Sequence, residues 1–128
     1  MTLTDYVIQK VSQAKAAAHK LATLPTDKKN AALLAMADAL ESREAELLKA
    51  NELDLSAAAT LPAAAKDRLT LTSKRIQEMA AGLRQVAALP DPVGHVFGLT
   101  PRPNGMQVGR MRVPIGVIGI IDVDKFHL

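Results

Sequence analysis

The stretch Gln107-Val-Gly-Arg-Met-Arg-Val-Pro-Ile-Gly-Val-Ile-Gly-Ile-Ile121 decides the fold of this chain. Its second half, from Ile115 to Ile121, is an unbroken apolar run rich in β-branched residues, and its two glycines disfavour a helix. Such a run is typical of a strand that is covered on both faces in a parallel sheet. We therefore predict a strand over residues 114–121.

The predicted strand requires partner strands that the sequence does not supply. Parallel neighbours are joined by crossover connections of about a dozen or more residues, yet only Asp122 to Leu128 follow. Leaving the Val and Ile side chains from Val117 to Ile121 in water would forfeit roughly 6–12 kcal/mol, at about 1.5–3 kcal/mol each. That loss rivals the whole stability of a domain, about 5–15 kcal/mol. We therefore expect the chain to be the opening portion of a larger protein.

The composition changes character near Pro90. All twenty-two alanines precede this residue, whereas six of the seven glycines and five of the seven prolines lie at or after it. Ala favours helix, whereas Gly and Pro punctuate strands and turns. We therefore predict helices over residues 1–93, a β-ribbon over 94–113, the strand over 114–121 and a tail over 122–128.

Apolar residues recur at helical spacing before this boundary. The first predicted helix has Thr4 as its N-cap, and its apolar stripe consists of Val7, Val11, Ala14, Ala18 and Leu21. A second helix follows Pro25 with Thr26 as its cap, and a third begins at Ser42 or continues the second with a kink near that residue. A short helix has Pro62 in its first turn and ends near Leu69, and the last helix is capped by Thr72. Asn51 lies on the apolar side of the third helix, where it would either contact a ligand or bond a nearby backbone group. We expect the second role.

The ribbon is predicted from two strands, His95–Leu99 and Met106–Val113. Asn104-Gly105 is a hairpin signal, but the prolines beside it indicate a loop longer than two residues. In the second strand Val108, Arg110 and Arg112 share one face, so that face is mainly basic and the opposite face is small and apolar. A two-stranded ribbon is marginal alone, so we expect it to lean on its own molecule or on a second subunit.

Composition excludes several classes of function. The net charge of +3 is spread without a run of like charge, and the aromatic residues are few, so we expect no nucleic-acid partner. The absence of Cys excludes a disulfide, a Cys-ligated metal and a Cys nucleophile within these residues. No stretch approaches the length of a membrane span, and no targeting segment is recognisable, so we expect no membrane partner and a cytoplasmic location.

Few motifs offer chemistry of their own. Gly116-Val-Ile-Gly119 lacks the third glycine, the Lys and the following helix of a phosphate-binding loop, so we reject it as a dinucleotide motif. The arginines of the ribbon would either clamp a phosphate or make interface and solvent contacts, and the second reading is favoured. The histidines, at positions 19, 95 and 127, share no local frame, so we predict no metal site.

Two parts of the sequence together carry a family resemblance. The first runs from Asp67-Arg-Leu-Thr-Leu-Thr-Ser-Lys-Arg-Ile76 through Arg84-Gln-Val-Ala-Ala-Leu-Pro-Asp-Pro-Val-Gly94, and the second is Arg112-Val-Pro-Ile-Gly-Val-Ile-Gly-Ile-Ile121. In their order and spacing they resemble γ-glutamyl phosphate reductase, also called glutamate-5-semialdehyde dehydrogenase, of the aldehyde dehydrogenase superfamily. The resemblance runs from the first helix to Ile121.

This resemblance implies an α/β parent protein with an aldehyde dehydrogenase-like fold. Residues 1–93 would be the helical N-terminal part of its cofactor-binding domain, and 94–113 would be a flap that forms a homo-oligomer. Residues 114–121 would be the first strand of its nucleotide-binding sheet. The chain itself is then expected to be mostly α-helical, with a β-ribbon and one strand.

The implied reaction is the NADPH-dependent reduction of L-glutamate 5-phosphate to L-glutamate 5-semialdehyde, with release of phosphate, in proline biosynthesis. In the family a cysteine attacks the acyl phosphate to form a thioester, which hydride then reduces. The chain contains no Cys, so we expect it to be inactive alone and to bind no NADPH by itself. Its status as an enzyme is therefore left open.

Only Ile120 and Ile121 match family positions near the cofactor, as an apolar wall, and both fit core positions equally well. At Asp122 the sequence departs from the family, which continues with Tyr-Glu-Ser or Ala-Arg-Pro-Asn-Val, so residues 122–128 form a tail outside the resemblance. The alternative to a part of a reductase is a non-catalytic assembly module that associates through its ribbon and its uncovered strand. Nucleic-acid binding through the ribbon arginines ranks last.

Overall fold

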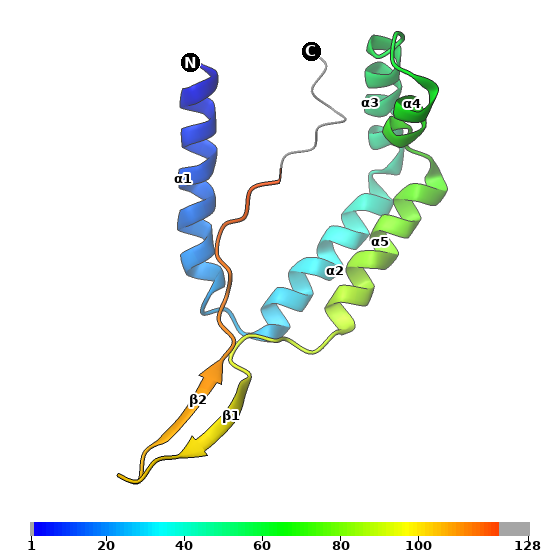
Figure 1. Cartoon of the computed structure of the whole chain (residues 1–128). Coiled ribbons are helices and arrows are strands. Elements are labelled where there is room, and N and C mark those ends of the chain that lie inside the picture. The colour runs from blue at the N-terminus through cyan, green and yellow to red at the C-terminus, as the bar shows by residue number, and fades with distance from the viewer. Residues whose placement is uncertain (1, 121–128) are drawn as a thin grey trace. The chain divides into compact units, whose positions relative to one another are not determined.

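The computed structural model describes residues 2–120, which divide into two compact units. One unit consists of residues 27–89, and we call it the helical unit. The other consists of residues 2–26 and 90–120, and we call it the ribbon unit. Figure 1 shows the elements of each. The described residues are mostly helical and carry one two-stranded antiparallel sheet, which confirms the predicted fold class for this chain.

The helical unit contains four helices around a small core. They are α2 (Thr26–Ser42), α3 (Glu44–Ala57), α4 (Ala63–Leu69) and α5 (Ser73–Ala88). In Figure 1, α2 and α5 run side by side. Ala37 of α2 and Ile76 and Ala80 of α5 are fully buried, and Ile76 is the one large side chain among the described residues that is completely enclosed.

Some helix ends follow the predicted signals. Thr72 caps α5, because its hydroxyl accepts a hydrogen bond from the backbone N–H of Arg75 at 3.2 Å. Pro62 was predicted in the first turn of the short helix, but it lies one residue before α4 as its N-cap residue, and α4 ends at Leu69 as predicted. The kink predicted near Ser42 is a break, because α2 ends at Ser42 and α3 begins at Glu44.

Asn51 joins the third helix to the segment between α4 and α5. Its side-chain amide donates to the carbonyl of Leu69 at 2.8 Å, and its Oδ1 accepts from the backbone N–H of Leu71 at 2.8 Å. The residue is 7% exposed. The predicted backbone-bonding role is confirmed, and the ligand-contact reading is not needed to explain this buried amide.

Replacing Asn51 by Ala should therefore destabilise the helical unit. Each backbone group left without its partner costs about 1–3 kcal/mol, and two groups are affected. Urea unfolding followed by circular dichroism would measure the change, with Glu52→Ala on the exposed side of the same helix as the control. Equal midpoints for the two variants would contradict this role of Asn51.

Two arginines of α5, Arg75 and Arg84, form ion pairs with residues of the helices α4 and α2. Arg84 forms a bidentate pair with Glu41 at 2.6 and 2.7 Å and also reaches Asp38 at 2.8 Å, which ties α5 to α2. The hydrogen bond from Arg84 lowers the pKa of Glu41 and, in return, raises the pKa of the guanidinium. Arg75 donates to the carbonyl of Thr70 at 2.6 Å and pairs with the carboxylate of Asp67 at 3.1 Å, which ties α5 to α4.

The ribbon unit begins with α1 (Leu3–Leu21). Thr2 is its N-cap, so the prediction of Thr4 is wrong. The Thr2 hydroxyl accepts from the backbone N–H of Asp5 at 3.1 Å, and the Asp5 carboxylate accepts from the backbone N–H of Thr2 at 2.9 Å, which completes a capping box. Thr26 was predicted to cap α2, but it is the first residue of that helix, and its hydroxyl donates to Asp91 at 2.9 Å.

The ribbon consists of β1 (Val96–Pro101) and β2 (Gln107–Met111), slightly shifted from the predicted bounds. Its loop is closed by the N–H of Arg102, which donates to the carbonyl of Met106 at 2.7 Å. Three residues therefore lie in the loop, and the expectation of more than two is confirmed. Gly105 has a φ of +84° there, as a hairpin turn requires. A bulge between Phe97 and Thr100 is placed at Gly98, which has a φ of +66°.

The predicted strand over residues 114–121 does not form within the described residues. Residues 112–120 are irregular, and Ile115, Ile118 and Ile120 are 89%, 65% and 84% exposed. The physical reason is the one given by the sequence: a strand needs a neighbour for its N–H and C=O groups, and among residues 2–120 the only sheet is the ribbon itself. Ile121 and the tail over 122–128 lie outside the described residues.

Candidate functional site: exposed apolar and basic surfaces

The described residues present three exposed surfaces. They are a groove on the helical unit, the irregular segment that follows the ribbon, and the two faces of the ribbon. No group of three or more His, Asp or Glu side chains between residues 2 and 120 is arranged to hold a metal ion. Within the same range, no helix is both long and apolar enough to cross a membrane.

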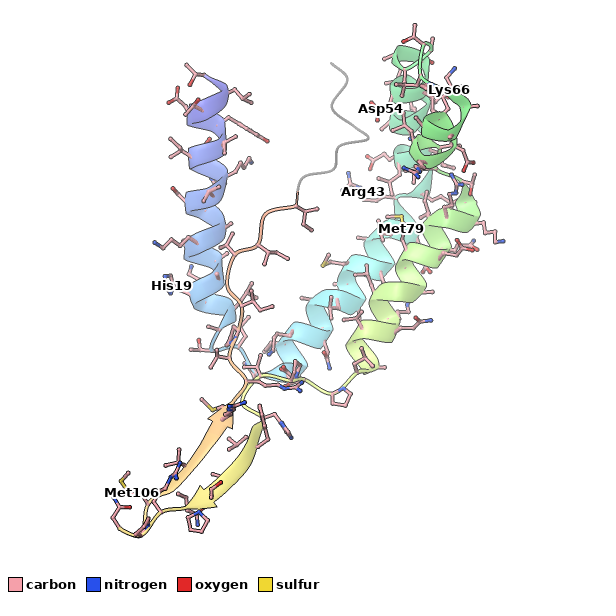
Figure 2. All side chains as sticks on the ribbon, in the orientation of Figure 1. His19, Arg43, Asp54, Lys66, Met79 and Met106 are labelled. Carbon is pink, nitrogen blue, oxygen red and sulfur yellow. The ribbon has the colours of Figure 1, made fainter. Side chains whose placement is uncertain are left out.

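The groove lies along α2 and α5 of the helical unit and has a volume of about 700 Å³. Its lining is mainly apolar and consists of Met36, Ala39, Leu40, Arg43, Leu47, Met79, Gly82, Leu83 and Val86. Arg43 and Met79 are labelled in Figure 2. An added Cβ at Gly82 would meet nothing within 4 Å, so the groove is open over the middle of α5. Met36, Met79 and Val86 are about half exposed, at 54%, 48% and 52%.

Apolar residues recur at helical spacing along α2 and α5, and the structure buries only part of each of these apolar stripes. In α5, Ile76 and Ala80 are buried, whereas Met79 and Val86 are not. The stripe is wider than the contact between α2 and α5, and this excess of apolar width was the available sequence signal for a further surface. Surfaces of this kind mark sites of contact with other protein.

The irregular segment lies along α1 in the ribbon unit. Together, α1 and the segment line a cavity of about 400 Å³ with Val11, Lys15, Ala18, His19, Ala22, Pro114, Gly116 and Val117. Its lining is mostly apolar, with Lys15 and His19 as the ionisable members. Figure 2 labels His19 near the C-terminal end of α1. The prediction that α1 has a one-sided apolar stripe fits this contact, although no residue of α1 is fully buried.

The two faces of the ribbon differ in chemistry. On one face Leu99 covers Gly109, whose added Cβ would lie 2.9 Å from Leu99 Cδ2, and Val96 pairs with Met111. The opposite face carries His95, Phe97, Arg110 and Arg112, which we call the basic face. Figure 2 labels Met106 at the tip of the ribbon. All residues of β1 and β2 are exposed, so neither face is covered by the described residues.

The structure does not bring the sequence-predicted site residues together into a catalytic site. Ile120 is 84% exposed and is the last residue described, and Ile121 lies outside the described range. Gly116 and Gly119 lie in the irregular segment over residues 112–120.

Comparison with known proteins identifies relatives of this chain. The chain is 57% identical over 123 residues to the gamma-glutamyl phosphate reductase of Moorella thermoacetica, and this match covers 94% of the chain. The chain is homologous to the N-terminal part of gamma-glutamyl phosphate reductase. The reductase of Syntrophomonas wolfei is 52% identical over 122 residues. No family model matches the chain.

A solved structure agrees with the sequence matches. The chain superimposes on the crystal structure of gamma-glutamyl phosphate reductase from Thermotoga maritima with a TM-score of 0.79 and 35% identity. This superposition covers 84% of the chain and 26% of the Thermotoga protein. The chain likewise spans only 29% of the length of the Moorella and Syntrophomonas reductases. The resemblance noted from the sequence is thus confirmed for the family.

Proposed function

We propose that this chain supplies the N-terminal helices, the oligomerisation ribbon and the first sheet strand of a gamma-glutamyl phosphate reductase. In this proposal residues 1–93 belong to the cofactor-binding domain, residues 94–113 form the flap, and residues 114–121 form the strand. The observation that supports it most is the identity of 50–57% to named reductases over 94% of the chain.

The reaction of the parent protein is the NADPH-dependent reduction of L-glutamate 5-phosphate to the 5-semialdehyde, a cytoplasmic step of proline biosynthesis. The family chemistry needs a cysteine thiolate that attacks the acyl phosphate and releases inorganic phosphate. None of the 128 residues is a Cys. We therefore assign no catalytic residue to this chain, and we assign NADPH to the parent protein.

In this proposal Ile120 and Ile121 form an apolar surface beside the cofactor in the parent protein. Ile120 is well suited to be covered there, because 84% of its surface is exposed within this chain alone. Burying an Ile side chain of this kind contributes about 1.5–3 kcal/mol. In this proposal the exposed apolar segment over residues 114–121 packs against the rest of the reductase.

A hybrid reductase tests the proposal. It joins residues 1–120 of this chain to the remaining part of the Moorella reductase, which is 57% identical over the matched region. We expect NADPH oxidation that depends on L-glutamate 5-phosphate, and we expect none from the 128-residue chain alone. A hybrid that folds but has no turnover, or turnover by the chain alone, would contradict the proposal.

A second candidate function is a non-catalytic assembly module. It is supported by the ribbon, whose residues are all exposed although they include Phe97, Leu99 and Met111. A homo-oligomer formed through the ribbon is common to both candidates. Light scattering at high protein concentration tests whether this homo-oligomer forms. A monomer at every concentration would argue against assembly through the ribbon.

A further inference from the structure

The net positive charge of this chain lies in one of its two units. Residues 2–26 and 90–120 contain six Lys and Arg residues but only two Asp and Glu residues, whereas residues 27–89 contain nine of each. The excess charge therefore lies entirely in the ribbon unit. Half of its cationic side chains are the ribbon arginines 102, 110 and 112.

The ribbon places two of these arginines on one face beside an aromatic ring. Phe97 pairs with Arg110 across the ribbon, and the N–H of Arg112 donates to the carbonyl of His95 at 3.0 Å. The Arg112 guanidinium lies 5.9 Å from the centre of the Phe97 ring, and the His95 ring stacks on Phe97 at 6.1 Å. On the basic face, the Phe97 ring therefore lies beside both His95 and Arg112 and orients the Arg112 guanidinium through a cation–π contact.

The arginines of this face are not neutralised by the described part of the chain. Neither Arg110 nor Arg112 forms an ion pair with a carboxylate among residues 2–120, whereas Arg43, Arg75 and Arg84 of the helical unit all do. A guanidinium fork matches a carboxylate with two parallel hydrogen bonds. Arg together with aromatic residues is also the composition favoured at the energetic centre of protein interfaces.

The outer edge of β2 provides a second recognition element. The sheet has only two strands within the described residues, so the side of β2 away from β1 has no strand beside it. Arg112 directs its N–H and C=O toward β1, so Met111, next in the chain, directs its own groups toward the open edge. An extended segment can add to such an edge through main-chain hydrogen bonds.

We infer that the basic face and the open edge of β2 together dock an extended, carboxylate-rich protein segment. Arg110 and Arg112 are two residues apart on one strand, which separates their Cα atoms by about 6.5–7 Å. Carboxylates at alternate positions of an extended segment have the same spacing and face the same side. The choice of a protein partner rests on the proposed function, in which the ribbon contacts a neighbouring subunit.

Nucleic acid is the less suitable partner for this surface. A single-stranded nucleic acid needs several stacking platforms, whereas Phe97 is the one aromatic residue of β1 and β2, and its ring already lies beside Arg112 and His95. Phosphate contacts also require many cations for useful affinity at physiological salt, and the basic face offers two arginines and His95.

Titration of the full 128-residue chain with defined peptides tests the inference. The probe is a six-residue peptide that alternates Thr and Glu, and the matched peptide alternates Thr and Gln. We expect the acidic peptide to bind, and nuclear magnetic resonance of the labelled chain to show shifts centred on β2. The double variant Arg110→Gln with Arg112→Gln should weaken binding about tenfold or more, because two charge-assisted contacts are lost.

A charge-matched variant and a further measurement keep this test specific. Lys10→Gln with Lys15→Gln removes the same charge from α1 and should change the affinity less than about twofold. Phe97→Leu should weaken binding while the ribbon amide shifts stay dispersed, because the ring that orients Arg112 is lost. Equal loss with both double variants, no binding of the acidic peptide, or tighter binding of a 12-base-pair DNA duplex would overturn the inference. None of these outcomes depends on turnover by the hybrid reductase.

Discussion

Ile76→Ala should lower the free energy of unfolding of the helical unit by about 2–5 kcal/mol, the range for a fully buried large-to-Ala substitution. Ile76 has no exposed surface, and it is the one large residue of the described core that is enclosed to this degree. The other fully buried residues of the described core, Ala37 and Ala80, are too small to fill the space that the substitution would leave. Urea unfolding of the 128-residue chain, followed by helical circular dichroism, measures the loss.

The matched control is Val86→Ala in the same helix. Val86 is 52% exposed and lines the open groove, so its truncation should change the unfolding free energy by less than about 1 kcal/mol. If the two variants unfolded at the same urea concentration, the complete burial of Ile76 in the helical unit would be wrong. The comparison also checks that the helical unit has a cooperative core, despite its exposed groove.

Ile118→Asp should abolish the activity of the hybrid reductase and leave the stability of the chain alone unchanged. Ile118 is 65% exposed in the described structure, so a carboxylate at this position remains in water. In the sheet of the hybrid the same carboxylate would be buried without a partner, at a cost of several kcal/mol. A cost of that size is comparable to the stability of a whole domain.

Ile118→Val is the control for shape and polarity, because it keeps the side chain apolar and β-branched. We expect the hybrid that carries it to retain most of its turnover, since a buried Ile→Val change costs about 0.5–1.5 kcal/mol. Turnover by the Ile118→Asp hybrid would show that residue 118 stays exposed to solvent in the assembled protein. That result would remove the strand from the proposal.

Local signals in the sequence predicted the helices and the ribbon well. The Thr72 cap depends only on neighbouring residues, and the structure confirms it. The Pro62 signal located the start of the short helix to within one residue. Asn104-Gly105 and the flanking prolines determine the hairpin loop within a few residues. The Thr4 assignment failed because Thr2, and not Thr4, has an acid three positions later that can complete a capping box.

Contacts between distant residues could not be predicted in this way. The Arg84 pairs with Asp38 and Glu41 span 46 and 43 residues and depend on how α2 and α5 pack. The sequence shows which residues of α5 are apolar, but only the structure shows that Ile76 and Ala80 are buried while Met79 and Val86 are exposed. The strand over 114–121 was predicted from its own side chains, whereas strand hydrogen bonds require a neighbour that lies elsewhere.

Amide hydrogen exchange at residues 115–120 tests the central claim most directly. The claim is that this apolar segment becomes a sheet strand when the rest of a reductase covers it. We predict exchange near the unprotected rate in the 128-residue chain and slowing by about a thousandfold or more at these amides in the hybrid reductase. Strong protection in the chain alone, or none in an active hybrid, would contradict the claim.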